Sequence, residues 1–240
     1  MKRTISFIAA LTMLLMISTS VSAAHYKIDY SSVVDNPVLK KIIKNSFKNR
    51  NNGLIKVPDE HPRLLLTKEY IEFLKENKDR DDIKPSYDMV MTYADRALPE
   101  KFDTLSDGIN IHLASRAFCY AVGAADKNYA RTTVDLAIKY LETAVTSQTY
   151  VISVYKDYGM AALACVEVYD WCYGAMTGAQ KTKLGELIRN MLYSSTQPCS
   201  PDKVEEWSHI ADKAVGQPLI YNCDIAIALY DEYPEIYETI

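Results

Sequence analysis

A helical period of apolar residues recurs in segment after segment from residue 110 onward, and it constrains the fold of this chain more than any other feature. In 110–124 the apolar positions 111, 114, 117, 118, 121 and 122 fall on one face of an α-helix. The segment 127–144 repeats this period, and 156–173 is apolar on nearly all sides, as a deeply buried helix is. No segment alternates polar and apolar residues between turn signals, as a half-buried strand would. The sequence therefore predicts an all-α fold.

Capping residues indicate where further helices begin. Thr67 is a good N-cap for a helix that ends near Asn77. The run Thr-Gly-Ala-Gln at 177–180 fits a capping box, because glutamine stands three residues after threonine. Ser200 followed by Pro201 fits an N-cap with proline at the first helical position. With the apolar period, these signals predict helices over 67–77, 84–98, 110–124, 127–144, 156–173, 177–193, from 201 to about 210, and over 220–230, the last ending before Pro234.

The links between the predicted helices are short and polar, so consecutive helices are expected to pack as antiparallel hairpins. A hairpin recurs roughly every 40 residues, a spacing typical of helical solenoids and of closed α/α toroids. Periodicity alone fits both architectures. We expect an irregular N-terminal connector over 24–59 and one helical domain over 60–240.

The N-terminus has the composition of a secretory signal peptide. Lys2 and Arg3 precede an apolar run over 5–17, and the small residues that follow end in Val-Ser-Ala at 21–23. This pattern predicts a signal peptide over 1–23 that is removed after Ala23. The apolar run is too short for a permanent membrane-spanning helix, which needs ~20 apolar residues. We therefore expect an exported protein, periplasmic or extracellular, without a membrane anchor.

Charge and cysteine content exclude several classes of partner and cofactor. Lys and Arg number 27 against 31 Asp and Glu, and this net charge of −4 argues against nonspecific binding to nucleic acid or an anionic membrane. The five cysteines form no C-x-x-C pair, and because five is odd, at least one is unpaired. Buried free thiols are the favoured interpretation. Without Cys/His ligand spacing, we predict no metal site and no cofactor.

Region 60–240 carries four motif segments in order. They are His61-Pro62-Arg63-Leu64-Leu65-Leu66-Thr67 before an acidic helix, the stretch 110–146 with its Asp126-x-x-Tyr129 link, the stretch 161–188 with Val168-Tyr169-Asp170-Trp171, and 227–237. In order and spacing, these segments resemble the heparinase II/III-like polysaccharide lyases. The resemblance covers most of the chain that follows the predicted signal peptide.

The resemblance implies an N-terminal α/α toroid followed by β-sandwich domains. This chain would then contain only part of the toroid. The resemblance also implies cleavage of an acidic, uronate-containing polysaccharide, such as heparin or heparan sulfate, by β-elimination. In that reaction a base removes the proton next to the sugar carboxylate, so the carboxylate must be neutralised. Asn, Gln, His or Arg can neutralise it. A tyrosine, sometimes with a histidine, transfers the protons and must be activated by its neighbours, because its ordinary pKa is ~10.

The segment around the last predicted helix supplies the candidate catalytic residues. Gln217 and Asn222 are suited to neutralise a carboxylate, and Tyr221 is suited to transfer a proton. His209 lies a few helical turns upstream. The segment departs from the family's pattern, because it contains no His followed by Glu. The remaining catalytic groups are expected beyond residue 240, so the isolated chain is expected to be inactive and, with an incomplete toroid, prone to aggregate.

Two other functional classes stay open. A glycoside hydrolase built on an α/α toroid needs two carboxyl groups ~5–9.5 Å apart. Asp157, Asp170 and Asp224 are available for this, but no spacing singles out a pair. A secreted helical-repeat binding protein needs no catalytic groups, and the 18 tyrosines offer apolar faces suited to sugar rings.

Other polar residues of the helical region have simpler interpretations. We predict that His61, before Pro62, has a structural role at the start of the helical domain, and that His112 is a core histidine. Asp170 and Glu167 lie within the pattern of a buried helix, where acids need partners, so we predict that they make structural hydrogen bonds rather than act as general acids.

Overall fold

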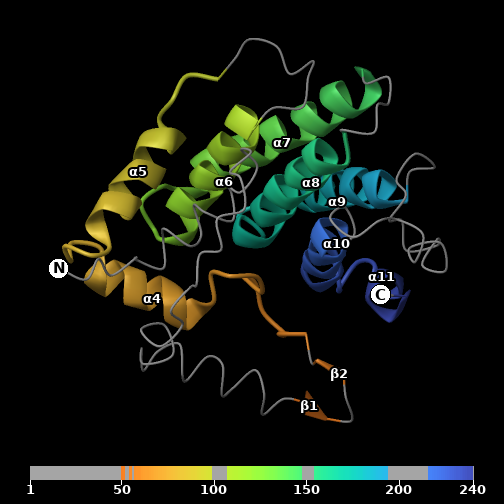
Figure 1. Cartoon of the computed structure of the whole chain (residues 1–240), viewed down its shortest axis with the longest axis horizontal. Helices are drawn as coiled ribbons and strands as arrows, with labels where there is room; N and C mark the ends of the chain where they lie inside the picture. The colour runs from red at the N-terminus through yellow and green to blue at the C-terminus, as the bar shows by residue number, and fades with distance from the viewer. Residues whose placement is uncertain are drawn as a thin grey trace, which may run out of the picture.

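The computed structural model describes residues 50–51, 54–55, 57–98, 107–147, 154–193 and 216–239. In these residues the chain is all-helical apart from one short antiparallel ladder, in which Arg50 lies opposite Ile55 (Figure 1). The elements are β1 (Arg50–Asn51), β2 (Leu54–Ile55), α4 (Lys68–Asn77), α5 (Lys84–Ala94), α6 (Asp107–Ala121), α7 (Lys127–Ser147), α8 (Val154–Trp171), α9 (Gly178–Leu192), α10 (Gly216–Ala228) and α11 (Pro234–Thr239). The prediction of an all-α fold is confirmed.

Most of the predicted helices are present, with ends that differ by a few residues. α5 ends at Ala94 rather than at 98, and α10 begins at Gly216, before the predicted start at 220. α11 is not among the predicted helices. It begins at Pro234, which is well suited to the first position of a helix because the main-chain N–H that proline lacks would have no partner within the helix there. The predicted helix from 201 and the predicted signal peptide lie outside the described residues.

Local capping interactions set several of these ends. The Thr67 side chain accepts a hydrogen bond from the Tyr70 main-chain N–H at 3.3 Å, so the predicted N-cap of α4 is confirmed. Thr177 and Gln180 form the predicted capping box at the start of α9. At the end of α6, Gly123 takes a positive φ of 77°, which glycine adopts without steric cost.

The longer helices lie in two rows. α6, α8 and α10 pack side by side, and α7 packs against α9 (Figure 1). The consecutive pairs α6–α7 and α8–α9 also pack together across short links. Because α8 contacts α6, α7, α9 and α10, it is covered on nearly all sides, which explains why its sequence is so uniformly apolar.

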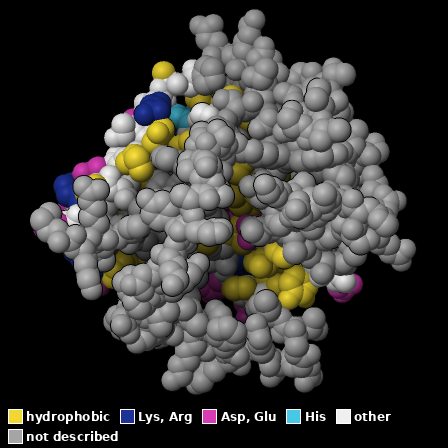
Figure 2. All heavy atoms as spheres, in the orientation of Figure 1, with side chains coloured by type: hydrophobic (Ala, Val, Ile, Leu, Met, Phe, Trp, Pro, Cys, Tyr) yellow, Lys and Arg dark blue, Asp and Glu magenta, His cyan; other side chains and the backbone are white. Residues whose placement is uncertain are grey.

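One hydrophobic core connects the eight helices that the structure describes, from Tyr70 and Leu74 of α4 to Ile236 of α11. On the face drawn in Figure 2, the described side chains that remain visible include hydrophobic groups beside both basic and acidic ones. Among the helices that the structure describes, none is both long and apolar enough to cross a membrane.

The described cysteines are all free, but they differ in exposure. Cys119, Cys165 and Cys172 are buried, as predicted. Cys223 is exposed, so the prediction of a buried thiol is wrong there. It follows the buried Asn222 on α10, on the side of that helix that faces away from the core, and the apolar sequence around it does not reveal this side. Cys199 lies outside the described residues.

His112 is a buried core histidine, as predicted. Its Nδ1 lies 3.0 Å from the Tyr93 carbonyl oxygen, which can only accept a hydrogen bond, so Nδ1 carries a proton. Burial lowers the pKa of His112, which favours the neutral ring.

Candidate functional site

Tyr221 and Asn222, two of the four predicted catalytic residues, lie together on α10 and are nearly buried, with 7% and 3% of their surfaces exposed. The Tyr221 ring packs directly on the backbone of Gly159 in α8, where a Cβ atom would lie only 1.8 Å from Tyr221 Cε2. The Tyr221 hydroxyl donates a weak hydrogen bond to Met160 Sδ at 3.5 Å. Glycine at 159 therefore permits the close approach of α8 and α10.

The structure does not describe the side chains of the other two predicted site residues. Gln217 lies in the first turn of α10, where only the backbone is described. His209 lies outside the described residues. Tyr221 and Asn222 are thus the described part of the predicted site.

Carboxyl groups of α8 and α10 interact across the interface between these helices. Glu167 of α8 is 2% exposed, and its Oε2 has no hydrogen-bond partner among the described residues. Burial, with the nearby charges of Asp224 and Asp170, raises the pKa of Glu167 to about 8. Burial and Asp170 raise the pKa of Asp224 to about 6. At neutral pH, Glu167 is therefore protonated and neutral.

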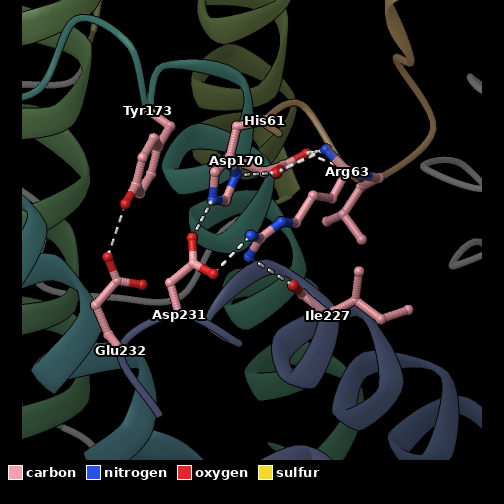
Figure 3. Close-up of polar contacts among 8 residues, drawn as sticks. His61, Arg63, Asp170, Tyr173, Ile227, Asp231 and Glu232 are labelled. Carbon is pink, nitrogen blue, oxygen red and sulfur yellow. Dashed lines mark hydrogen bonds and ion pairs between the residues drawn. The ribbon is translucent and has the colours of Figure 1, made fainter. Parts of the chain in front are cut away.

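Asp170, in the last turn of α8, holds the segment 61–64 against the end of that helix (Figure 3). The Arg63 N–H donates to both carboxylate oxygens of Asp170 at 2.9 Å, and the Leu64 N–H donates to Oδ2 at 2.9 Å. His61 Nδ1 lies 2.6 Å from Asp170 Oδ1. Since that oxygen accepts hydrogen bonds, Nδ1 donates. The predicted structural hydrogen bond of Asp170 is confirmed.

Arg63 extends this set of contacts to the C-terminal end of α10. Its guanidinium donates to Asp231 Oδ1 at 2.7 Å and to the Ile227 carbonyl oxygen at 3.4 Å (Figure 3). His61 Nε2 lies 3.8 Å from Asp231 Oδ2, on the other side of the same carboxylate. We call His61, Arg63, Asp170 and Asp231 the Arg63 cluster.

Tyr173, just after α8, packs against this cluster. The His61 ring stacks on the Tyr173 ring at 3.7 Å, and Lys181 Nζ of α9 lies 3.3 Å from the Tyr173 ring centre. Because the imidazole covers one face, the ammonium occupies the other, in a cation–π contact. The Tyr173 hydroxyl donates to Glu232 at 2.9 Å, and burial together with this bond raises the pKa of Tyr173 to about 12. Tyr173 is therefore a poor candidate for a catalytic base.

The Arg63 cluster is suited to holding chain segments in place rather than to reacting with a ligand. The side chains of His61 and Arg63 are buried, and the His61 ring is enclosed by two carboxylates and an aromatic ring. Among the described side chains, no group of three or more His, Cys, Asp or Glu residues is placed to hold a metal ion.

The sequence does not single out the Arg63 cluster as a unit, although it carries one local signal. A negative charge in the last turn of a helix is unfavourable, because that end carries the negative pole of the helix dipole. Asp170 occupies such a position in α8, so it requires donors from elsewhere in the fold. The sequence alone does not say that those donors lie more than 100 positions away.

No protein-family model matches this sequence, and no curated protein is significantly similar to it.

Proposed function

We propose that this chain is the helical, N-terminal part of an exported polysaccharide lyase that cleaves uronate-containing glycans, of the heparin or heparan sulfate type, by β-elimination. One observation carries the proposal beyond the resemblance of separate motifs. The segments that resemble the family are in contact: Asp170, from 161–188, binds the main chain of 61–64, and Arg63 binds Ile227 at the start of 227–237. Motifs that form one structural unit are better support for a common family than motifs that only follow one another.

The two rows of helices suit the α/α toroid that the resemblance implies. In such a fold, alternate helices form an inner and an outer layer, and the contacts of α8 with α6 and α10, and of α7 with α9, follow that alternation. We propose that α6, α8 and α10 belong to one layer of such a ring.

In the proposed reaction, the Asn222 amide donates a hydrogen bond to the uronate carboxylate, which increases the acidity of the neighbouring C–H. Tyr221 transfers a proton at the same sugar, and Gln217 and His209 are secondary candidates for these two roles. Because Tyr221 and Asn222 are nearly buried, the proposal requires side chains around α10 to move when substrate binds.

A product assay tests the proposal directly. Because the isolated chain is expected to be inactive, the full-length parent lyase is incubated with heparan sulfate, heparin and other uronate polymers, alongside a neutral glucan as control. Elimination leaves an unsaturated uronate that absorbs in the near ultraviolet, so absorbance should rise with the uronate polymers and stay constant with the glucan. New reducing ends without this absorbance would indicate hydrolysis, and binding without any product would indicate a carbohydrate-binding protein. Sequencing of the exported protein should give an N-terminus near Ala24.

A glycoside hydrolase is the second candidate, favoured by the raised pKa values of Glu167 and Asp224. A carboxyl group that stays protonated near neutral pH can act as a general acid. Asp170 is unsuited to this role, because hydrogen bonds from the main chain occupy its carboxylate. For this candidate, Asp224→Asn should abolish the release of reducing ends.

A further inference from the structure

Arg63 joins the C-terminal ends of two helices. Its main-chain N–H is bound by Asp170 in the last turn of α8, while its side chain reaches Ile227 in the last turn of α10 and Asp231 just beyond (Figure 3). The Arg63 side chain is 1% exposed, whereas that of Asp231 is 44% exposed. The positive charge of Arg63 is therefore buried, and its partners Asp231 and the Ile227 carbonyl group fix its position.

The chemistry at the end of α10 favours such a fixed placement. The last carbonyl groups of a helix lack partners within the helix, and a cation there also interacts favourably with the helix dipole. Arg63 supplies both a donor for the Ile227 carbonyl group and the positive charge. A planar guanidinium can donate to a carbonyl and a carboxylate at once, in directions that its rigid plane fixes. A lysine ammonium sits on a flexible side chain, so it fixes the directions of its hydrogen bonds less well.

α10 approaches α8 at a second point, nearer its N-terminus, where the Tyr221 ring lies on Gly159. Tyr221 and Ile227 are six positions apart, which corresponds to roughly 9 Å along a helix axis. Two contacts so separated determine the tilt of one rigid helix against another. A change at Arg63 therefore leaves α10 attached to α8 at Tyr221 but less restrained at its other end.

We propose that Arg63 is a positioning residue that fixes the placement of α10 against α8, and through α10 the placement of Tyr221 and Asn222. The catalytic consequence rests on the proposed lyase function, but the placement of α10 does not. Arg63 contacts neither of these two residues in any described hydrogen bond or ion pair, so its effect on them is expected to pass through the helix.

Hydrogen exchange with mass spectrometry tests the placement of α10 in the whole protein. Arg63→Met keeps the length of the side chain and removes its donors and charge, and Asp231→Asn weakens the same contact from its exposed end. Arg189→Gln is the matched control, because Arg189 binds Glu235 at 3.3 Å and so joins α9 to α11 without a described hydrogen bond to α10.

Arg63→Met should speed exchange in 216–228 by roughly tenfold, the effect of losing a hydrogen bond to a charged group. Asp231→Asn should have a smaller effect at the same place, and Arg189→Gln should leave α10 unchanged.

Two results would overturn the proposal: unchanged exchange of α10 in Arg63→Met, or an equal increase in α4, α7 and α9, which would mean general destabilisation. If Arg63→Met does not fold, Asp231→Asn decides by the same comparison. Arg63→Lys should restore part of the protection of α10.

Activity on a uronate polymer tests the catalytic consequence. Arg63→Met should lower kcat with little change in KM, because a displaced α10 misplaces reacting groups more than it weakens binding. A raised KM with normal kcat would refute the link from α10 to the chemistry. These activity measurements use the full-length parent lyase. If the unaltered parent forms no unsaturated product, the proposed function fails, and the exchange experiment still decides the role of Arg63.

Discussion

The Arg63 guanidinium donates a 2.7 Å hydrogen bond to the Asp231 carboxylate, although 168 positions separate the two residues. The main chain of Arg63 is bound at the same time by Asp170. The segment 61–64 therefore lies between the end of α8 and the turn that follows α10. It connects the start of the described helical region, just before α4, to the C-terminal part of that region. The predictions below test this arrangement and the site on α10.

Asp170→Asn should lower the free energy of unfolding by about 3 kcal/mol, as expected when a buried acceptor of several hydrogen bonds loses its charge. The new amide group would place its own donors opposite the N–H groups of Arg63 and Leu64. Urea unfolding measures the change. Asp135→Asn, at an exposed acceptor of a side-chain hydrogen bond from Gln180, is the control and should change stability by less than about 0.5 kcal/mol. Equal effects of the two variants would contradict the role given to Asp170.

Gly159→Ala should destabilise the protein by about 1–3 kcal/mol, because the added methyl group overlaps the Tyr221 ring and must push α10 away from α8. Gly178→Ala is the matched control, since no atom lies within 4 Å of the Cβ position at this first residue of α9. It should be neutral or slightly stabilising. Thermal unfolding of both variants checks the prediction. A neutral Gly159→Ala would mean that α10 does not pack on α8 as described.

Stability should fall by on the order of a few kcal/mol as pH rises from about 4.5 to about 8. Over this range the folded protein keeps a proton on Glu167, whose pKa burial raises to about 8, while the unfolded chain has released it. The folded state thus binds more protons than the unfolded state, and raising the pH favours unfolding. Asp224 contributes in the same direction between pH 3.8 and about 6.

Urea unfolding at several pH values measures this dependence. Glu167→Gln should flatten it, because the variant has no proton to lose at this site. Glu186→Gln, at an exposed acid of α9, should leave the dependence unchanged. A dependence that is the same in Glu167→Gln and in the unaltered protein would show that Glu167 titrates normally.

Tyr221→Phe should separate catalysis from packing. The ring that packs on Gly159 is kept, and the described hydrogen bond that is lost, to Met160 Sδ at 3.5 Å, is weak. Because the packing of the ring is kept, stability should change by only about 1 kcal/mol, the usual net contribution of a hydrogen bond. If Tyr221 transfers a proton, formation of unsaturated product should fall by about 10²-fold or more. Turnover equal to that of the unaltered full-length parent would show that Tyr221 is not a catalytic residue.

The four described cysteines should differ in reactivity. Cys223 is exposed and should be alkylated first in the folded protein. Burial raises the pKa of Cys119 to about 11 and that of Cys172 to about 12, so both stay as unreactive thiols at neutral pH. Mass spectrometry of each labelled peptide provides the order of reaction. Labelling of Cys172 as fast as Cys223 would contradict the burial of α8.

Local features account for what was predicted correctly about the fold. The N-cap at Thr67, the capping box at 177–180 and the apolar face of α6 each depend on residues within a few positions of one another, so they are visible in the sequence. The start of α11 at Pro234 was missed because proline ends one helix as readily as it begins another. The exposure of Cys223 was missed because both sides of α10 are rich in apolar residues.

By itself, the sequence determined the helical class of this protein and the approximate position of most described helices, because helix formation depends on a period and on caps within single segments. Only the tertiary structure decided which polar groups meet. Asp170 needs donors and Arg63 needs acceptors, but hydrogen bonding specifies chemical type and geometry, not position in the chain. Their partners, His61 and Asp231, come within reach only because the packing of α8 against α10 brings the ends of these helices together.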